Sequence, residues 1–377
     1  MQILQVYNNM INVVFDHQIF GWQKYGGISR YFYELATKIN SGGDISLEIL
    51  APRYITRYFD EENSLNIHGH FLESTNLHPR LLRSMNYFLA NVKVRNFKPD
   101  IIHETYFAAM GYSKPKKTKT VLTVYDLIHE KFPEYFSKYD PTIYEKKRAI
   151  ERADHILAIS HHTKADLLEF YDIPEEKITV TQLGFDLQVS HSITPVIPKI
   201  SPYILFVGNR GGHKNFSNLL IAYQNNKALC DNFKLVCFGG GQFTEAERYF
   251  MKSLGVSDNN LVQVTGDDGV LSQYYQNASV FVYPSEYEGF GIPPLEAMNY
   301  SCPVVCSNVS SIPEVVGQAG HYFDPLDTVD IGEKIEDILF DNQLSDHLIS
   351  SGRDRLTQFS WERCAAETTS VYKKVLS

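Results

Sequence analysis

The sequence predicts an α/β protein made of two doubly wound parallel sheets, each with its own hydrophobic core. Short apolar and β-branched segments alternate along the chain with stretches of helical periodicity, as in the repeated strand–helix units of a parallel sheet. Residues 187–202, with three prolines and three serines, interrupt this alternation, which begins again at Tyr203. The length of 377 residues and the hydrophobic content of 44% suit two separate cores.

These observations predict an N-terminal domain over residues 1–186, a linker over 187–202 and a C-terminal domain over 203–360. The first nine residues precede a second methionine, Met10, and we assign them little functional weight.

The N-terminal domain contains several segments with the length and the β-branched or apolar content of buried strands. They are residues 11–16, 46–51, 101–102, 120–124, 155–159 and 178–180. Between them, Ile28, Phe32, Leu35 and Ile39 fall at helical spacing and predict a helix. A second helix, capped by Ser160, is expected to run to Tyr171.

The C-terminal domain repeats the pattern. We expect strands at 203–207, 234–238, 279–283 and 303–306, with a further strand that ends at Val264. Helices are predicted from Pro293, over 311–316 and over 361–374.

Composition excludes several classes of protein. The formal net charge of −9 argues against a nucleic-acid partner, because affinity for a polyanion depends on lysine and arginine. Five cysteines without a signal peptide suggest a reducing cytoplasm, and their spacing does not suggest zinc. There is no apolar run of about 18 residues, so we expect no membrane span.

One predicted helix, residues 78–98, has two interpretations. Apolar residues (Leu81, Leu82, Met85, Phe88, Leu89 and Val92) alternate there with basic ones (Arg80, Arg83, Lys93, Arg95 and Lys98). Such a helix can lie on an anionic membrane surface, which a lipid-linked acceptor would require, and the basic loop 114–119 would add to this contact. It can also be a core-facing helix with a solvated outer face, which base rates favour.

Two carboxylates distinguish the stretch from Tyr283 to Met298. Glu288 lies in a turn after a predicted strand, and Glu296 lies in the helix that follows. At such a junction free backbone N–H groups and the positive end of the helix dipole suit a phosphate, which Gly289 and Gly291 would allow to approach closely.

The two glutamates require a different kind of partner. Ionised carboxylates only accept hydrogen bonds and would repel a diphosphate, so they need hydroxyl donors, such as a sugar and a ribose on either side of a diphosphate. An acidic residue in the first turn of a helix is common and would explain Glu296 alone, but it does not explain Glu288.

Glycine-containing loops follow three other predicted strands: Gly26-Gly27, the segment 208–215 and Gly239–Gly241. The first loop does not have the G-x-G-x-x-G spacing of a dinucleotide site, and turn chemistry alone explains about half of such Gly-Gly pairs. In the second loop, Arg210 can bind a phosphate through two parallel hydrogen bonds and Lys214 adds a point charge. Their position at the carboxyl end of a strand favours function over chance exposure.

The segment Glu288-Gly-Phe-Gly-Ile-Pro-Pro-Leu-Glu296 resembles the E-x7-E motif of the retaining family 4 glycosyltransferases, which have the GT-B fold. The resemblance implies two Rossmann-like domains facing a central cleft, with the C-terminal helix, residues 361–377, packing back on the first domain. It implies that Glu296 holds the ribose and that Glu288 lies near the donor sugar. It covers nearly the whole chain from Met10 and is most specific over 203–325.

The resemblance also assigns the other site residues. Many members have His-Asp where this chain has Tyr125-Asp126. In those members the histidine is assigned a hydrogen bond to the donor sugar, and in this chain no residue is assigned that role. His129 or His103 could supply it, although a lone histidine is more often a packed residue. We expect catalytic roles for Glu288, Arg210, Lys214 and Asp126, with Arg210 one place from the commonest spacing. The expected substrate-binding residues are Gly26, Gly27, His129, Gly208, Asn209, Gly239, Gly240, Thr265, Gly289, Phe290, Gly291, Ile292 and Glu296.

The expected function is transfer of a hexose, with retention of configuration, from a nucleotide diphosphate sugar to a hydroxyl of a glycan or lipid-linked acceptor in polysaccharide biosynthesis. By resemblance the first choice of donor is UDP-glucose and the second is a GDP-sugar, GDP-mannose. We expect no cofactor and no metal, because the sequence has no D-x-D motif and two cations can neutralise the leaving group. We expect the enzyme in the cytoplasm, and at the inner face of the membrane if the basic helix binds lipid.

Two alternatives belong to other classes. A nucleotide-sugar epimerase of the same fold would convert the donor in the absence of an acceptor. A non-catalytic nucleotide-sugar-binding subunit would form no product with any acceptor, and Tyr125 in place of the family histidine is its only support.

Overall fold

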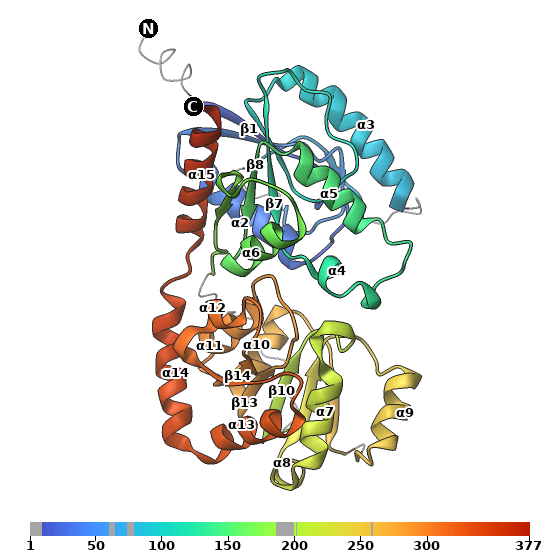
Figure 1. Cartoon of the computed structure of the whole chain (residues 1–377), viewed down its shortest axis with the longest axis vertical. Coiled ribbons are helices and arrows are strands. Elements are labelled where there is room, and N and C mark those ends of the chain that lie inside the picture. The colour runs from blue at the N-terminus through green and yellow to red at the C-terminus, as the bar shows by residue number, and fades with distance from the viewer. Residues whose placement is uncertain (1–9, 60–64, 74–78, 186–199, 201, 258) are drawn as a thin grey trace. The chain divides into compact units, whose positions relative to one another are not determined.

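The computed structural model describes residues 10–59, 65–73, 79–185, 200, 202–257 and 259–377. The chain forms two compact units. Unit 1 extends to Gly184 and includes Ser360–Ser377, and unit 2 is Phe185–Phe359. Each unit is a parallel sheet with helices on its faces (Figure 1). The expected linker, 187–202, lies outside the described residues except at 200 and 202, as do the first nine residues.

Unit 1 is built on a seven-stranded sheet of order β4-β2-β1-β6-β7-β8-β9, in which every pairing is parallel. A separate two-stranded sheet pairs β3 with β5. The strands are β1 (Ile11–Phe15), β2 (Ile45–Ile49), β3 (Arg53–Tyr54), β4 (Asn66–Ile67), β5 (His70–Phe71), β6 (Ile101–Glu104), β7 (Lys119–Val124), β8 (His155–Ala158) and β9 (Ile178–Val180).

The helices of unit 1 follow from their apolar spacing and caps. In α2, Phe32, Leu35 and Ile39 are buried as their spacing predicts. Ser160 caps α6 by accepting a hydrogen bond from the Thr163 N–H. The helices are α2 (Gly27–Ser41), α3 (Pro79–Phe97), α4 (Ile128–Lys131), α5 (Thr142–Arg152), α6 (His161–Phe170) and α15 (Trp361–Leu376), with single 3-10 turns at Pro133–Tyr135 and Glu175–Lys177.

The C-terminal helix α15 packs in unit 1, beside α2. The Tyr372 hydroxyl lies 2.7 Å from Nδ1 of His103, and Lys38 and Glu362 form an ion pair of 2.6 Å. A Cβ atom on Gly184 would lie 2.4 Å from the backbone nitrogen of Trp361. Only glycine therefore fits where the chain passes the start of this helix.

Unit 2 has a six-stranded parallel sheet of order β12-β11-β10-β13-β14-β15. Its strands are β10 (Tyr203–Val207), β11 (Lys234–Phe238), β12 (Leu261–Val264), β13 (Val280–Tyr283), β14 (Val304–Ser307) and β15 (Gly320–Phe323). Its helices are α7 (Phe216–Asn225), α8 (Lys227–Asn232), α9 (Glu245–Ser253), α10 (Asp268–Asn277), α11 (Ile292–Asn299), α12 (Ile312–Val316), α13 (Thr328–Phe340) and α14 (Asn342–Leu356), with 3-10 turns at Gly212–Lys214 and Gly317–Ala319. Apolar residues of the strands, α7 and α13 form its core.

Each sheet has a topological switch point, where two neighbouring strands lead the chain in opposite directions. In unit 1 it lies between β1 and β6, and in unit 2 between β10 and β13. In open parallel sheets ligands bind outside the carboxyl ends of the strands at this point. The predicted fold class, two doubly wound parallel sheets, is confirmed, and the loops after these four strands are where a site is expected.

Candidate active site

Backbone and side-chain hydrogen bonds join the two loops at the switch point of unit 2. The Glu286 N–H, in the loop after β13, donates to the His213 carbonyl, in the loop after β10, at 2.7 Å. Nδ2 of Asn215 donates to the Pro284 carbonyl at 3.1 Å and to the Pro325 carbonyl at 2.7 Å. These contacts hold the predicted site residues of both loops close together.

Lys214 and Glu288, which were predicted to act in one site, are in direct contact. Nζ of Lys214 lies 2.6 Å from Oε1 of Glu288, and their side chains are 23% and 13% exposed. The same ammonium lies 5.7 Å from the ring centre of Tyr283, the last residue of β13. A mostly buried ion pair on an aromatic ring therefore lies where the topology places a ligand.

The Glu288 carboxylate stays ionised although it is buried. Burial raises its pKa, but the Lys214 ammonium, with a smaller effect from the neighbouring Ser285 and Tyr283 hydroxyls, lowers it by more, so the pKa lies below the usual glutamate value. The backbone is fixed too: the Glu288 N–H donates to Oγ of Ser310 at 3.0 Å, and Oγ of Ser311 donates to the Glu288 carbonyl at 2.8 Å. Glu288 can accept hydrogen bonds but has no proton to donate at neutral pH.

The turn after Glu288 needs glycine at one position. Gly291, the N-cap residue of α11, has φ of 107°, a conformation that residues with a side chain rarely adopt. Pro293 and Pro294 have no N–H group, so they remove two of the donors that a helix usually offers at its start. N–H donors for an anion at this junction would therefore have to come from the turn before the prolines, and their role stays a prediction.

Glu296 lies on α11 and is half-buried. The Tyr275 hydroxyl, on α10, donates to its Oε2 atom at 3.1 Å. The Tyr275 ring is itself stacked on Tyr300. Tyr275 therefore orients the carboxylate, a role that sequence patterns did not indicate because the two residues lie on different helices.

Arg210 differs from the expectation. Its guanidinium does not point to an open phosphate site; it donates to Glu247 at 2.6 Å and to the carbonyls of Gly239, Gly240 and Gly241 at 3.0 to 3.3 Å. The Arg210 side chain is 2% exposed. Because its donors are engaged in this way, Arg210 organises the glycine loop after β11, while Lys214, paired with Glu288, lies at the switch point.

The other predicted residues of unit 2 lie at the carboxyl ends of its strands. Gly208 and Asn209 follow β10, Gly239 and Gly240 follow β11, and Thr265 follows β12. Gly239 and Gly240 have φ of 89° and 67°, so their loop also depends on glycine. Asn209, Gly240 and Thr265 are exposed.

Phe290 was expected to bind substrate through the amides of this turn, and its side chain is buried. Its ring packs edge-on against Phe359, with 5.7 Å between ring centres. The backbone of Phe290 can still face a ligand. Its side chain anchors the turn to the core of unit 2.

The predicted site residues of unit 1 lie in different loops and helices. Gly26 is the N-cap residue of α2 and Gly27 its first residue, so both follow β1 as expected. Asp126 lies two residues before α4 and accepts a hydrogen bond from the Ile128 N–H at 3.2 Å. The His129 ring is stacked on Phe136 at 3.8 Å, and burial lowers its pKa.

Neither His103 nor Tyr125 offers a free group for a sugar. Both nitrogens of His103 have partners, Tyr372 at 2.7 Å and Thr123 at 2.8 Å, and burial lowers its pKa to about 3. His103 is therefore a core residue. The Tyr125 hydroxyl donates to the Thr105 carbonyl at 2.9 Å.

The switch point of unit 1 contains a polar network that the sequence did not reveal. Oδ1 of Asp16, just after β1, accepts hydrogen bonds from the N–H and the hydroxyl of Thr105, just after β6, at 2.9 and 2.6 Å. The Tyr112 hydroxyl donates to the other oxygen, Oδ2, at 3.1 Å. Asp16 ends the predicted first strand, but its partner lies 89 residues away, beyond the range of any local pattern.

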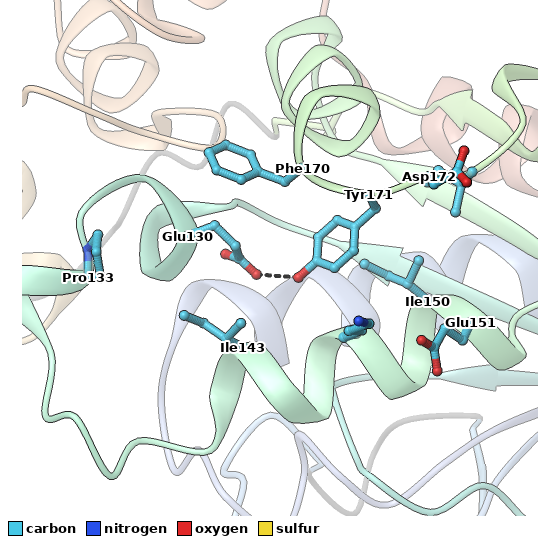
Figure 2. Close-up of a pocket in the computed structure, with 10 residues that line it drawn as sticks. Glu130, Pro133, Ile143, Ile150, Glu151, Phe170, Tyr171 and Asp172 are labelled. Atoms are coloured by element: carbon cyan, nitrogen blue, oxygen red, sulfur yellow. Dashed lines mark hydrogen bonds between the residues drawn. The ribbon is translucent and has the colours of Figure 1, made fainter.

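A pocket of about 610 Å³ lies elsewhere in unit 1, between α4, α5 and α6 (Figure 2). On its wall the Tyr171 hydroxyl donates to one oxygen of Glu130 at 2.6 Å, and Nζ of Lys146 donates to the other at 2.7 Å. Ile143, Ile150 and Phe170 supply apolar surface. No predicted site residue lines this pocket, and the Glu130 oxygens are already paired.

Two family profiles match the chain. The one described as "Glycosyltransferase Family 4" matches residues 25–189, and the one described as "Glycosyl transferases group 1" matches residues 192–355. Together they cover most of both units.

Relatives of known name agree with these matches. The chain is 29% identical over 374 residues to O-antigen chain mannosyltransferase B of Escherichia coli, covering 92% of this chain and 96% of the relative. It is 30% identical over 302 residues to the serotype-specific mannosyltransferase WbdA of Escherichia coli, covering 73% of this chain and 37% of the relative. This chain thus spans little more than a third of WbdA.

A solved structure shares the fold. The structure of a glycosyltransferase from Rickettsia africae ESF-5 matches with a TM-score of 0.70 and 19% identity, over 98% of this chain and 99% of that one. Among the helices that the structure describes, none is both long enough and apolar enough to cross a membrane. No group of three histidine, cysteine or acidic side chains within the described ranges is arranged to bind a metal ion.

Proposed function

Because this chain belongs to the family 4 glycosyltransferases of the GT-B fold and acts in polysaccharide biosynthesis, we propose that it transfers mannose from GDP-mannose to a hydroxyl of a growing saccharide. The support for mannose is that the relatives reported above are named mannosyltransferases. These names favour GDP-mannose over UDP-glucose, the first choice from the sequence.

The observation that carries this proposal is the contact between Lys214 and Glu288 at the switch point of unit 2. The ammonium would bind the diphosphate of the donor, where it offsets negative charge. The carboxylate, held ionised, would accept hydrogen bonds from hydroxyls of the sugar. One nucleotide diphosphate sugar satisfies both groups.

Glu296 would bind the ribose of the same donor. A carboxylate in contact with the Tyr275 hydroxyl is held in one orientation and can accept a bidentate pair of ribose hydroxyls. The nucleotide would lie against the glycine loop that Arg210 fixes. This loop needs glycine at position 240, since a Cβ atom there would lie 2.7 Å from the guanidinium.

In the proposed reaction the bond between C1 of the sugar and the diphosphate oxygen breaks, and a bond from C1 to the acceptor oxygen forms on the same face. Lys214 and the N–H groups of the turn from Gly289 to Ile292 would stabilise the charge on the departing diphosphate. That diphosphate takes the proton from the acceptor hydroxyl. Glu288 is ionised and paired with Lys214, so it is better placed to hold the sugar than to shuttle this proton.

Retention of configuration and independence from metal ions are parts of this proposal. The first is tested by the anomeric configuration of the product, measured by NMR. The second is tested by activity after treatment with a chelator, which we expect to be unchanged. The acceptor class proposed is a saccharide with free hydroxyls, either free or lipid-linked.

The donor is tested by thermal unfolding with GDP-mannose, UDP-glucose, GDP and UDP. A ligand at a hundred times its Kd adds about 2.7 kcal/mol of stability, so GDP-mannose should raise the melting temperature by several degrees. Incubation with GDP-mannose and a mannose-terminated oligosaccharide should give a product one hexose heavier. A larger shift with UDP-glucose and a glucosylated product would overturn the choice of mannose, and isomerised donor in the absence of an acceptor would overturn transfer itself.

A further inference from the structure

Helix α3 of unit 1 has apolar side chains on two opposite faces. Leu82, Ala90 and Val94 are buried and, with Asn86, form the inner face. Nδ2 and Oδ1 of Asn86 bond the backbone of Arg53 at 2.8 and 2.9 Å. These residues are spaced four apart, so one stripe of the helix is fixed against the rest of unit 1.

A second stripe points outward. Leu81, Phe88 and Val92 are 57%, 68% and 48% exposed, and Met85 is half-buried. These four residues, here called the outer stripe, fall within about 60° of one another around the helix axis. Figure 1 shows α3 at the periphery of unit 1, with other elements of the unit on one side of it only. The core-facing interpretation of this helix thus explains only one of its two apolar faces.

The helix that carries the outer stripe has charged side chains of one sign, and the acidic groups near it belong to other segments: Glu145 pairs with Arg83, and Asp154 pairs with Lys114 and Lys119. From Pro79 to Phe97 the helix has no aspartate or glutamate, in a chain with 44 of them. Arg95 continues the stripe by one turn, and its Nη2 atom donates to Oγ of Ser113 at 3.0 Å. This contact brings the segment that leads to Lys116 and Lys117, both exposed, against the same helix. An exposed apolar stripe therefore lies beside exposed cations, in a protein whose net charge is −9.

We propose that the outer stripe of α3, with Arg95, Lys116 and Lys117, is a docking surface for an anionic lipid bilayer. The apolar side chains would enter the boundary between headgroups and acyl chains, and the cations would lie against the phosphates. A nucleic acid would use the cations but would leave Phe88 and Val92 in water. A second protein copy with the same positive face would be repelled. An anionic membrane satisfies both the apolar and the cationic parts of the surface.

The test is co-sedimentation of the full chain with vesicles. Vesicles of equal parts phosphatidylglycerol and phosphatidylcholine should bind the protein, pure phosphatidylcholine should bind it much less, and about 1 M salt should weaken binding because it shortens the Debye length to about 3 Å. The double variant Phe88→Gln, Val92→Gln should lose about tenfold or more in partition. Lys116→Gln with Lys117→Gln should lose about fivefold per cation.

Matched controls lie in unit 2. Leu326 and Val329 are 71% and 65% exposed, so Leu326→Gln with Val329→Gln removes similar exposed apolar surface. Lys234→Gln with Lys252→Gln removes two exposed cations. Both controls should bind anionic vesicles as the parent chain does.

Three results would overturn the proposal. One is a parent chain that does not bind anionic vesicles, and another is equal loss of binding in the α3 variants and the controls. The third is a parent chain that forms a dimer in sedimentation velocity experiments, together with a Phe88→Gln, Val92→Gln variant that is monomeric but binds vesicles as the parent does. A second copy of the chain would then be the occupant of the surface. Because all four substituted α3 and loop residues are exposed, the melting temperature should stay near that of the parent.

Discussion

Replacing Lys214 by methionine tests the centre of the proposed site most directly. The substitution keeps most of the side-chain volume and removes the ammonium 2.6 Å from Glu288. If that ammonium stabilises the departing diphosphate, its loss should lower kcat by about 10² to 10³, equivalent to about 2.7 to 4 kcal/mol, as for one preorganised oxyanion donor. Turnover near that of the parent would remove Lys214 from the reaction.

The same variant should change how activity depends on pH. In the parent, Lys214 helps hold the pKa of Glu288 below the usual value of about 4.3, so the carboxylate stays ionised at any pH above that. Without the ammonium the effect of burial prevails and the pKa of Glu288 rises. The acidic limb of the kcat/KM profile should therefore move to higher pH in Lys214→Met.

A double variant separates catalysis from stability. A carboxylate that is 13% exposed and has lost its cation should lower the free energy of unfolding by about 1–3 kcal/mol at neutral pH. Adding Glu288→Gln removes that unpaired charge, so urea unfolding should show stability recovered while turnover stays low. If both recover together, the pair is structural and the proposed chemistry is wrong.

Three further predictions concern other residues. Glu296→Ala should weaken binding of the nucleotide sugar by about 1–3 kcal/mol, since ribose hydroxyls would lose their acceptor; calorimetry with unchanged affinity would reject the ribose role. Arg210→Lys keeps the charge but cannot reach Glu247 and the glycine carbonyls together, so both the melting temperature and donor affinity should fall; full donor affinity in this variant would instead support a simple charge contact with phosphate. Burial lowers the pKa of His103 to about 3 and that of His17 to about 4, so below about pH 6.5 the unfolded chain binds protons that the folded chain does not. The free energy of unfolding should therefore fall by about 1.4 kcal/mol per histidine for each unit by which the pH is lowered. Urea titrations of His103→Gln should show a shallower fall.

The central strands of both sheets could be predicted from the sequence because their signals are local, whereas the two-residue strands β3, β4 and β5 and the edge strand β15 were not predicted. A short β-branched segment such as Val280–Tyr283 is buried on both faces, and the prolines after Gly291 mark a helix start. Lys214 and Glu288 could be placed at the carboxyl ends of their strands because each lies in the loop directly after a predicted strand. Their contact follows from strand order, which places β10 beside β13.

The partners of buried charges could not be predicted in this way. Glu247 lies 37 residues after Arg210, on a helix that no sequence pattern linked to the phosphate site, so the arginine could equally have been free. Helix α3 shows the same limit. Its periodicity gives two apolar stripes, and the structure shows which one faces inward: Leu82, Ala90 and Val94 are buried, and Asn86 bonds the backbone of Arg53.

The contact between Lys214 and Glu288 also predicts which ligands the site prefers. The two groups neutralise each other, so a ligand that binds one must compensate the other in a mostly buried place. A nucleoside diphosphate satisfies the ammonium and leaves the carboxylate short of a donor, whereas a nucleotide sugar supplies phosphate oxygens and hydroxyls together. The parent chain should therefore bind GDP-mannose more tightly than GDP. In Glu288→Gln the Lys214 ammonium has no carboxylate partner, and no carboxylate needs a hydrogen-bond donor. Calorimetry should show that the variant binds GDP more tightly than the parent chain does. The preference of the variant for GDP-mannose over GDP should be smaller. A preference ratio that is the same in both proteins would show that Glu288 does not contact the sugar.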